Sequence, residues 1–353
     1  MDTFAAKPPL PPQLPFLILP WRKEQLVYPY GVRIPTLFCI VDNQVHPIHK
    51  LPRTRCFGSY DGGWLFIANG QKDEHELLNL YTMRSITIPN TATTWDEKTI
   101  SLTLLAATLS TAPPPMIGPV APLDLRCAGA AIVSTFPDVT IPSPRIVLWF
   151  VGEGEPYYLS APAYSSYPYV VVDVIYRDGA FRFLTEREYV LEVTTTFDEE
   201  RRLSAVVEKP VFFEERGRDD DHDVQGRYLV ESRGELLMVV RLPSRESPGT
   251  TFAFRVFQMQ QLNHQQPSHP MATARGAWTT LPDLDGRILF VGRGCSRSYE
   301  VADFPGSKEG IYFLDDRDYK RVEMIHSDAD YREYSCSEND GAASPGTITI
   351  NAL

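Results

Sequence analysis

The chain has 353 residues, of which 43% are hydrophobic and 22% are charged, and its formal net charge is −11. This length and apolar content exclude wholesale disorder and are sufficient for one large closed all-β domain or for two ordinary domains. The chain is acidic and has no stripe of basic residues that could bind a phosphate backbone, so we do not expect a nucleic acid as its partner.

The N-terminal residues predict neither a secretion signal nor a membrane anchor. Residues 1–13 (MDTFAAKPPLPPQ) are rich in proline, which is typical of an extended, disordered tail. The apolar stretch from Leu14 to Trp21 is broken by proline and is far shorter than a membrane span of about 20 residues. We therefore expect a soluble intracellular protein of the cytoplasm, the nucleus or both, with no membrane partner.

Glycine-centred turns lead into short apolar strands at four places in the chain. The four turns are Asp61-Gly62-Gly63, Asp178-Gly179, Arg233-Gly234 and Asp285-Gly286. Such dipeptides favour β-hairpins, because glycine adopts positive φ without a Cβ penalty. The last three turns recur about every 50 residues, which is the period of kelch-type propeller blades. We therefore expect four hairpins, each in a different blade, with positive φ at Gly179 or Gly286.

Short strands are expected along most of the chain. They cover residues 37–41, 64–67, 76–81, 85–89, 129–136, 145–151, 157–161, 169–176, 181–184, 189–196, 203–207, 228–231, 236–241, 252–259, 278–281, 288–291, 310–313 and 321–325. The apolar run at 100–109 fits either a strand or a short helix. Many short strands separated by turn signals indicate a barrel, a sandwich or a propeller.

The repeat length favours the propeller, because about 50 residues accommodate four strands. We predict an all-β fold, a single kelch-like β-propeller of about six four-stranded antiparallel blades at residues 14–335, followed by a C-terminal tail at 336–353. The strand at 37–41 is expected to pair with the last blade, because an open ring would expose edge strands.

The five cysteines predict free thiols. They are odd in number and widely scattered: Cys39, Cys56, Cys127, Cys295 and Cys336. No pair has C-x-x-C spacing, so neither a zinc site nor a redox motif is indicated. We expect all five to be reduced in an intracellular compartment.

No metal or cofactor site is predicted. Residues 219–223 (DDDHD) carry oxygen ligands, but they lack the glycine and the distal glutamate of an EF-hand loop, and a charge run of this kind is usually solvated. His46 and His49 flank a proline and have no thiol or carboxylate close behind them, so they are interpreted as loop residues.

The segment from Gly292 to Ser298 (GRGCSRS) is a candidate contact loop. Successive backbone N–H groups and arginines suit an anion, but the segment lacks the Gly-Lys-Ser/Thr ending of a P-loop. It is interpreted as a polar loop that leaves the strand at 288–291. If a partner or an anion touches this loop, the expected contact residues are Arg293, Ser296, Arg297, Ser298 and Tyr299.

Five segments of the chain resemble the plant domain-of-unknown-function 295 family, whose members are F-box-associated, kelch-like β-propeller proteins. They are CFGSYDGGWLFIA (56–68), LLNLYTMRSITIP (77–89), YVVVDVIYRDGAFRFLT (169–185), GRYLVESRGELLMVVR (226–241) and the run from FRVFQM to FLDD (254–316). The resemblance covers roughly residues 15–330. It implies a propeller that acts as the substrate receptor of a cullin ubiquitin ligase.

Members of that family commonly have a module that we do not expect in this chain. They commonly begin with an F-box, a helical module that docks onto the linker subunit of the ligase. Here the stretch from Leu14 to Pro20 resembles the start of the propeller portion, and residues 1–13 are too proline-rich for amphipathic helices. We therefore expect no direct binding to the linker subunit.

The expected function is a non-enzymatic protein–protein interaction module whose partner the sequence does not identify. No G-x-S-x-G elbow or other catalytic motif occurs, so no catalytic residue is predicted. Two alternatives stay open at this point. One is a substrate-receptor component of a cullin ubiquitin ligase that uses an F-box in trans. The other is an enzyme with its site in the propeller channel, because triads are recognised by geometry and not by order.

Overall fold

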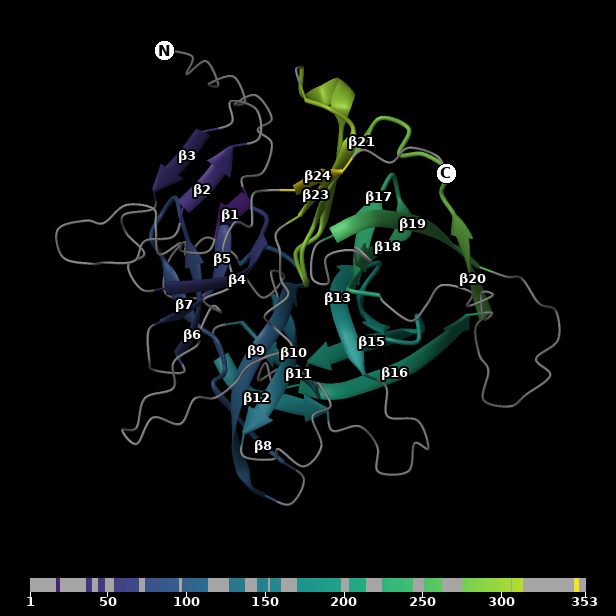
Figure 1. Ribbon diagram of the computed structural model, residues 1–353. Helices are drawn as coiled ribbons and strands as arrows, with labels where there is room; N and C mark the ends of the chain where they lie inside the picture. The colour runs from purple at the N-terminus through teal and green to yellow at the C-terminus, as the bar shows by residue number, and fades with distance from the viewer. Residues whose placement is uncertain are drawn as a thin grey trace, which may run out of the picture.

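The computed structural model describes part of the chain. The described residues are 17–19, 36–39, 44–47, 54–69, 74–94, 97–113, 127–136, 145–151, 153–159, 170–197, 203–213, 224–243, 251–261, 275–305, 307–313 and 346–348. Their regular structure consists of strands and one short 3-10 turn, η2 (Val301–Asp303). The sheets follow one another around a common centre (Figure 1). This confirms the predicted all-β propeller.

Blades 1 and 2 are antiparallel sheets from the first half of the chain. Blade 1 contains β4 (Thr54–Tyr60), β5 (Trp64–Asn69), β6 (Glu74–Asn79) and β7 (Ser85–Thr87) in that order. Blade 2 contains β8 (Thr91–Thr93), β9 (Thr99–Leu109), β10 (Ala128–Phe136), β11 (Arg145–Phe150) and β12 (Glu153–Leu159), also in consecutive order. The ambiguous run at 100–109 is therefore a strand.

Blades 3 and 4 repeat the same four-stranded meander. Blade 3 contains β13 (Val171–Arg177), β14 (Ala180–Thr185), β15 (Val190–Phe197) and β16 (Leu203–Phe213). Blade 4 contains β17 (Gly226–Ser232), β18 (Glu235–Pro243), β19 (Thr251–Gln261) and β20 (Arg275–Thr280). The last strands, β16 and β20, also form a short parallel pair, Phe212 with Arg275 and Phe213 with Gly276. The two blades are thus joined into one eight-stranded sheet.

Blade 5 has a different strand order. It contains β21 (Arg287–Val291), β22 (Arg297–Glu300), β23 (Gly310–Phe313) and β24 (Gly346–Ile348), arranged as β22-β21-β23-β24 with β21 and β23 parallel. A separate three-stranded sheet is formed by β1 (Leu17–Leu19), β2 (Thr36–Cys39) and β3 (Gln44–Pro47).

Two details of the predicted architecture are corrected. The described strands form five blades and not about six, because blade 2 has five strands and extends over more residues than the 50-residue period allows. The ring is not closed by the strand predicted at 37–41. That strand, β2, pairs with β1 and β3, whereas β23 of blade 5 pairs with β24 from the C-terminal residues.

The blades pack face to face, so their middle strands are buried on both sides. All six residues of β14 are buried. Phe181 and Phe183 face blade 2, where they contact the cluster that contains Ile132, and Leu184 packs with Met238 on the side of blade 4. Similar clusters lie between blades 1 and 2 and between blades 4 and 5. This two-sided burial explains why the strands read as continuous apolar runs and not as alternating ones.

The glycine turns have the backbone conformation that the sequence predicts. Gly179 and Gly286 have φ of +79° and +76°, and each follows an aspartate that also has positive φ. The turn at 61–63 joins β4 to β5, and those at 178–179 and 233–234 join β13 to β14 and β17 to β18. The fourth turn is not a hairpin. Arg287 N–H donates to the Leu284 carbonyl at 3.1 Å, but the segment before the turn does not pair with β21.

Replacement of Gly286 by valine is expected to lower the free energy of unfolding by about 1–3 kcal/mol, because a β-branched residue is strained at positive φ. An added Cβ would have no heavy neighbour closer than the Arg233 Nη2 atom at 4.0 Å, so the cost comes from the backbone and not from a clash. Urea titration of wild type and variant measures this cost. A variant that unfolds at the wild-type midpoint would contradict the assigned turn.

Candidate functional site

A buried carboxylate lies where the blades converge. Asp173 stands in the middle of β13 with only 1% of its surface exposed. Its Oδ1 atom accepts hydrogen bonds from the backbone N–H groups of Val174 at 2.8 Å and Gly294 at 2.6 Å. Its Oδ2 atom accepts one from Leu229 N–H at 2.6 Å. Because Leu229 is in β17 and Gly294 lies between β21 and β22, one side chain joins blades 3, 4 and 5.

Burial raises the pKa of Asp173 from its ordinary 3.8 to about 7. Desolvation disfavours the charged form, and the three backbone donors together with the nearby Arg293 guanidinium oppose this effect. All three donors belong to the protein's own backbone. The carboxylate therefore acts first as a structural acceptor.

The residues 292–298, here called the axial segment, extend the contacts to the other two blades. A Cβ atom added at Gly294 would lie 2.5 Å from the Ala107 carbonyl oxygen in β9 of blade 2. The Arg297 Nε atom lies 3.1 Å from Asp61 Oδ1 in the β4–β5 turn of blade 1, and its guanidinium lies over the Tyr60 ring at 5.5 Å. Blade 5 therefore contacts every other blade through this segment.

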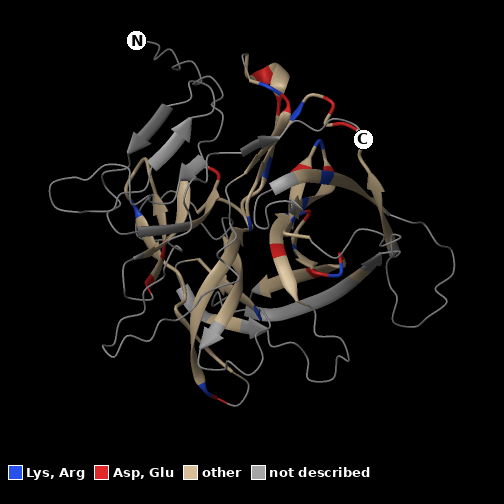
Figure 2. Cartoon of the chain, in the orientation of Figure 1, with Lys and Arg blue, Asp and Glu red and all other residues tan. Residues whose placement is uncertain are grey.

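Two further arginines join the turns of successive blades. The Arg177 Nη2 atom, at the end of β13, donates to the Gly234 carbonyl in the β17–β18 turn. Arg233, in that same turn, donates to the Asp285 carbonyl and to the Asp285 carboxylate, both at 2.6 Å. Together with the Arg297 contact to Asp61, these links connect blade 3 to 4, 4 to 5 and 5 to 1. Among the described residues, many charged residues lie at turns and strand ends, while most of the described strand length is uncharged (Figure 2).

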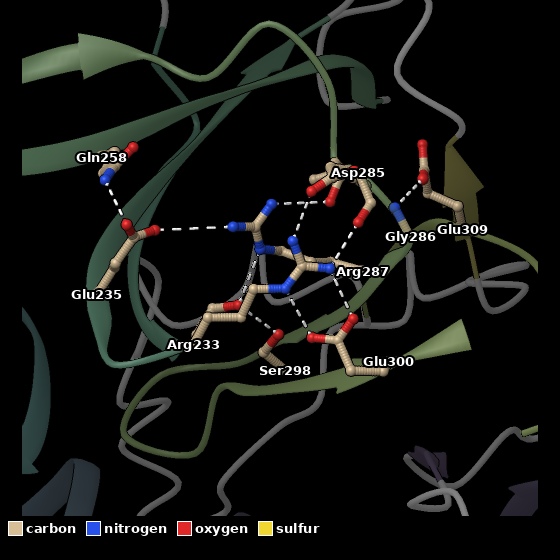
Figure 3. A network of polar contacts seen from close by, with 11 residues as sticks. Arg233, Glu235, Gln258, Asp285, Gly286, Arg287, Ser298, Glu300 and Glu309 are labelled. Atoms are coloured by element: carbon tan, nitrogen blue, oxygen red, sulfur yellow. Dashed lines mark hydrogen bonds and ion pairs between the residues drawn. The ribbon is translucent and has the colours of Figure 1, made fainter. Parts of the chain in front are cut away.

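The polar network between blades 4 and 5 surrounds Arg233 and Arg287 (Figure 3). Arg233 also pairs with Glu300 of β22 at 2.6 Å, and this hydrogen bond holds the pKa of Glu300 below its ordinary value. The buried Arg287 donates to Ser232 Oγ at 3.1 Å and to the Leu284 carbonyl at 3.0 Å, and lies 3.6 Å from Glu235. The arginines of this network are engaged with the protein's own acceptors.

The five predicted contact residues make contacts within the chain. Ser296 is buried, and its hydroxyl donates to the Gly292 carbonyl at 3.0 Å. The Ser298 hydroxyl lies 2.8 Å from Ser232 Oγ. The half-buried Tyr299 packs edge-on against Phe290 and Phe304. Arg297 pairs with Asp61, and the Arg293 guanidinium offsets a small part of the rise in the pKa of Asp173 that burial causes. That a partner or an anion touches this loop stays a prediction.

Asp173 was not singled out from the sequence. The signal is present, since Asp173 is the single charged residue in an apolar run (YVVVDVIY) that reads as a buried strand. A lone carboxylate in such a run must find hydrogen-bond donors when buried. Its donors lie 56 and 121 positions away at Leu229 and Gly294, so sequence spacing alone could not have identified them.

Only some of the other candidate metal-binding residues and cysteines lie in the part of the chain that the structure describes. The aspartate run at 219–223 and His49 lie outside the described residues, and so does the side chain of His46. The part of the chain that the structure describes contains no group of three metal-ligating side chains. Cys127 and Cys295 are not in disulfides, and burial raises the pKa of Cys127 to about 12. The side chains of Cys39, Cys56 and Cys336 are outside the described residues. No helix of the described residues is long and apolar enough to cross a membrane.

The chain was compared with known proteins and with protein-family models. The β-propeller domain of Cps50 (Swd1) from Myceliophteria thermophila is 12% identical, with a TM-score of 0.33, over 85% of this chain and 93% of that chain. No curated protein matches the sequence. The model of the KIB1-4 beta-propeller family matches residues 37–335. This match supports the predicted membership in a propeller family, whereas plant origin and the lack of an F-box stay predictions. The chain belongs to the KIB1-4 beta-propeller family.

Proposed function

We propose that this protein is a non-enzymatic protein–protein interaction module, in which the five blades form a rigid scaffold that presents turns to a partner. The observation that carries the proposal is the axial segment. Other propellers could offer a binding or catalytic site in the channel at the centre of the ring. In this chain the backbone of the axial segment occupies that place, because Gly294 N–H donates to Asp173 and Gly294 lies against Ala107. The outer turns and blade surfaces are then left for recognition.

The enzymatic alternative is less well supported by the same geometry. A catalytic site needs titratable groups with perturbed pKa values that face a substrate. Asp173 has the required shift, but its two oxygens already accept three backbone hydrogen bonds. A substrate could reach it only after the axial segment moved away.

Purification and reconstitution test the proposal. The tagged 353-residue chain is purified from cells that naturally produce it, and proteins that co-purify in stoichiometric amounts are identified by mass spectrometry. Each candidate is then expressed and mixed with the purified chain. The proposal predicts that at least one candidate forms a one-to-one complex with purified components. Failure of every candidate to bind in the purified mixture would reject it.

The same purified chain tests the ligase alternative. We propose that it does not bind the linker subunit of a cullin ubiquitin ligase directly, because the described residues offer strands and a single 3-10 turn in place of F-box helices. A size-exclusion run with linker subunit in excess should show two separate peaks. A stoichiometric complex would instead favour the substrate-receptor function. Binding that requires a separate F-box protein would support the receptor function in trans.

A further inference from the structure

The middle strand of blade 1 has apolar side chains on both faces. In β5, Trp64 and Phe66 belong to the cluster that blade 1 shares with blade 2. Leu65 and Ile67 alternate with them and belong to a second cluster, whose described members all come from blade 1. Because successive side chains along a strand point to opposite faces of the sheet, this second cluster lies on the face that blade 1 directs away from blade 2.

Blade 5 has the same division between its two faces. In β21, Leu289 and Val291 belong to the cluster shared with blade 4, whereas Ile288 and Phe290 belong to a separate cluster. The described members of that separate cluster come from blade 5 and from residues 301–304. Blade 5 therefore directs an apolar face away from blade 4, toward the seam with blade 1.

Both faces are buried, yet they do not pack directly on each other. Leu65 and Ile67 are 3% and 2% exposed, and Ile288 and Phe290 are 0% and 6% exposed. At the other four seams, residues of neighbouring blades form one shared cluster. Here the described residues form two clusters, one in each blade. Another element of the chain must therefore lie between the two faces and cover both.

The sheet of β1, β2 and β3, here called the N-terminal sheet, has the properties of such an element. Its strands have three or four residues each and, among the described strands, pair only with one another. Adjacent residues are apolar in β1 (Leu17-Ile18-Leu19) and in β2 (Leu37-Phe38), so the sequence pattern puts apolar residues on both faces of this sheet. A small sheet of this kind is stable only when its apolar faces are covered.

The position of the N-terminal sheet agrees with this interpretation. Figure 1 shows it in the sector of the ring between blade 1 and blade 5. The short segment 48–53 connects β3 to β4, so the sheet stays close to blade 1. The match to the family model begins at residue 37 and therefore includes most of β2 and all of β3 in the propeller.

We propose that the N-terminal sheet is a detachable wedge, seated between blade 5 and blade 1 and packed on the apolar faces of both. This device is separate from the proposed interaction function and does not depend on it. No described strand of a blade pairs with the wedge, so packing holds it in place. Its release would leave the strand pairing of every described blade intact.

The ring would open at this seam when the wedge leaves. Within the described residues, blades 5 and 1 are joined directly by Arg297, which pairs with Asp61 and lies over the Tyr60 ring. The Asp61 side chain is 73% exposed, and exposed ion pairs contribute little to stability. The shared apolar clusters would meanwhile hold the other four seams together.

Photo-crosslinking in the full chain identifies what covers the face of blade 1. p-Benzoylphenylalanine replaces Leu80, which is half-buried against the cluster that contains Leu65. The same group in place of Tyr81, whose side chain is 81% exposed, is the matched control one residue further on. Mass spectrometry should find crosslinks from position 80 to the N-terminal sheet and none from position 81. Crosslinks from position 80 to blade 5 or to another distant segment would overturn the proposal.

Thiol labelling of the native chain shows whether the wedge detaches. Three variants each place one reporter thiol in a buried apolar cluster: Ile67→Cys on blade 1, Ile288→Cys on blade 5, and the control Val193→Cys between blades 2 and 3. Labelling of each reporter is followed by mass spectrometry of its peptide. The two reporters at the seam should be labelled at equal rates, at least about tenfold faster than the control, because local opening exposes them without global unfolding.

A substitution in the wedge itself gives the second readout. Phe38→Ala truncates the central strand of the N-terminal sheet, and Val45→Ala is a smaller truncation in β3 for use if the first variant does not fold. Either should accelerate labelling of both seam reporters and leave the Val193→Cys reporter unchanged. Acceleration at only one seam reporter would overturn the proposal, because the sheet would then cover a single face. Equal labelling rates for all three reporters would also overturn it, because the seam would then open only by global unfolding.

Discussion

Replacement of Asp173 by alanine is expected to lower the free energy of unfolding by roughly 3–5 kcal/mol, because it leaves three buried backbone N–H groups without an acceptor. These groups belong to blades 3, 4 and 5, so the substitution weakens the contacts between blades and not the strand pairing within one blade. Urea unfolding followed by tryptophan fluorescence measures the effect. Asp283→Ala removes an exposed aspartate and serves as the matched control, which should unfold like wild type.

The same carboxylate predicts a pH dependence with a defined sign. The pKa of Asp173 in the folded protein is about 7, above the ordinary 3.8 that we take for the unfolded chain. The unfolded chain therefore releases this proton at lower pH than the folded one. The stability that the protonated group confers is present in full below about pH 4 and is lost as the pH rises through 7, at up to about 1.4 kcal/mol per pH unit.

An Asp173→Asn variant isolates this titration from the other carboxylates. Its amide does not titrate, and its oxygen can still accept from Val174 and Gly294, although its NH2 group faces the Leu229 N–H. Between about pH 5 and pH 8, wild type should lose stability relative to this variant. A difference between the two proteins that is the same at both pH values would show that Asp173 is not the titrating group.

Replacement of Gly294 by valine is expected to destabilise the protein by more than 3 kcal/mol, because two costs add. The residue has φ of +71°, and an added Cβ would lie 2.5 Å from the Ala107 carbonyl oxygen and 2.8 Å from the Ala107 nitrogen. Both atoms are backbone, so no side chain can rotate out of the way. The axial segment would have to withdraw, which also breaks the Gly294 hydrogen bond to Asp173.

A second glycine separates these two costs. Gly179 has φ of +79° and no heavy atom within 4 Å of an added Cβ. Gly179→Val therefore suffers the backbone strain alone, about 1–3 kcal/mol. If the two valine variants unfold at the same urea concentration, the close approach of Gly294 to blade 2 does not exist in solution.

The sequence predicted the features that depend on neighbouring residues. Apolar runs, turn dipeptides and their spacing predicted an all-β propeller, and the positive φ at Gly179 and Gly286 follows from local backbone preference. The turn at 285–286 has the expected backbone without being a hairpin. Turn chemistry fixes the bend of the chain, but the partner of each flanking strand is chosen by packing between blades.

The features that the sequence did not predict depend on long-range assembly. The segment at 292–298 reads as a polar loop, yet the ring of blades encloses it and places Gly294 against blade 2 and Arg297 against blade 1. Tyr81 lies in a stretch that reads as the end of a strand, so its exposure could not be expected from the pattern. Only the ring arrangement distinguishes an enclosed polar segment from an exposed aromatic turn.

The central claim is that the protein closes its own axis with the segment at 292–298 and leaves its outer turns for binding. Amide hydrogen exchange of Gly294 tests it most directly, with the exposed Gly179 turn as the internal reference. Because the Gly294 N–H donates to buried Asp173, we predict exchange only through global unfolding, as slow as that of Leu229 in β17. Exchange of Gly294 as fast as that of Gly179 would mean that the axis is open, and would contradict the account.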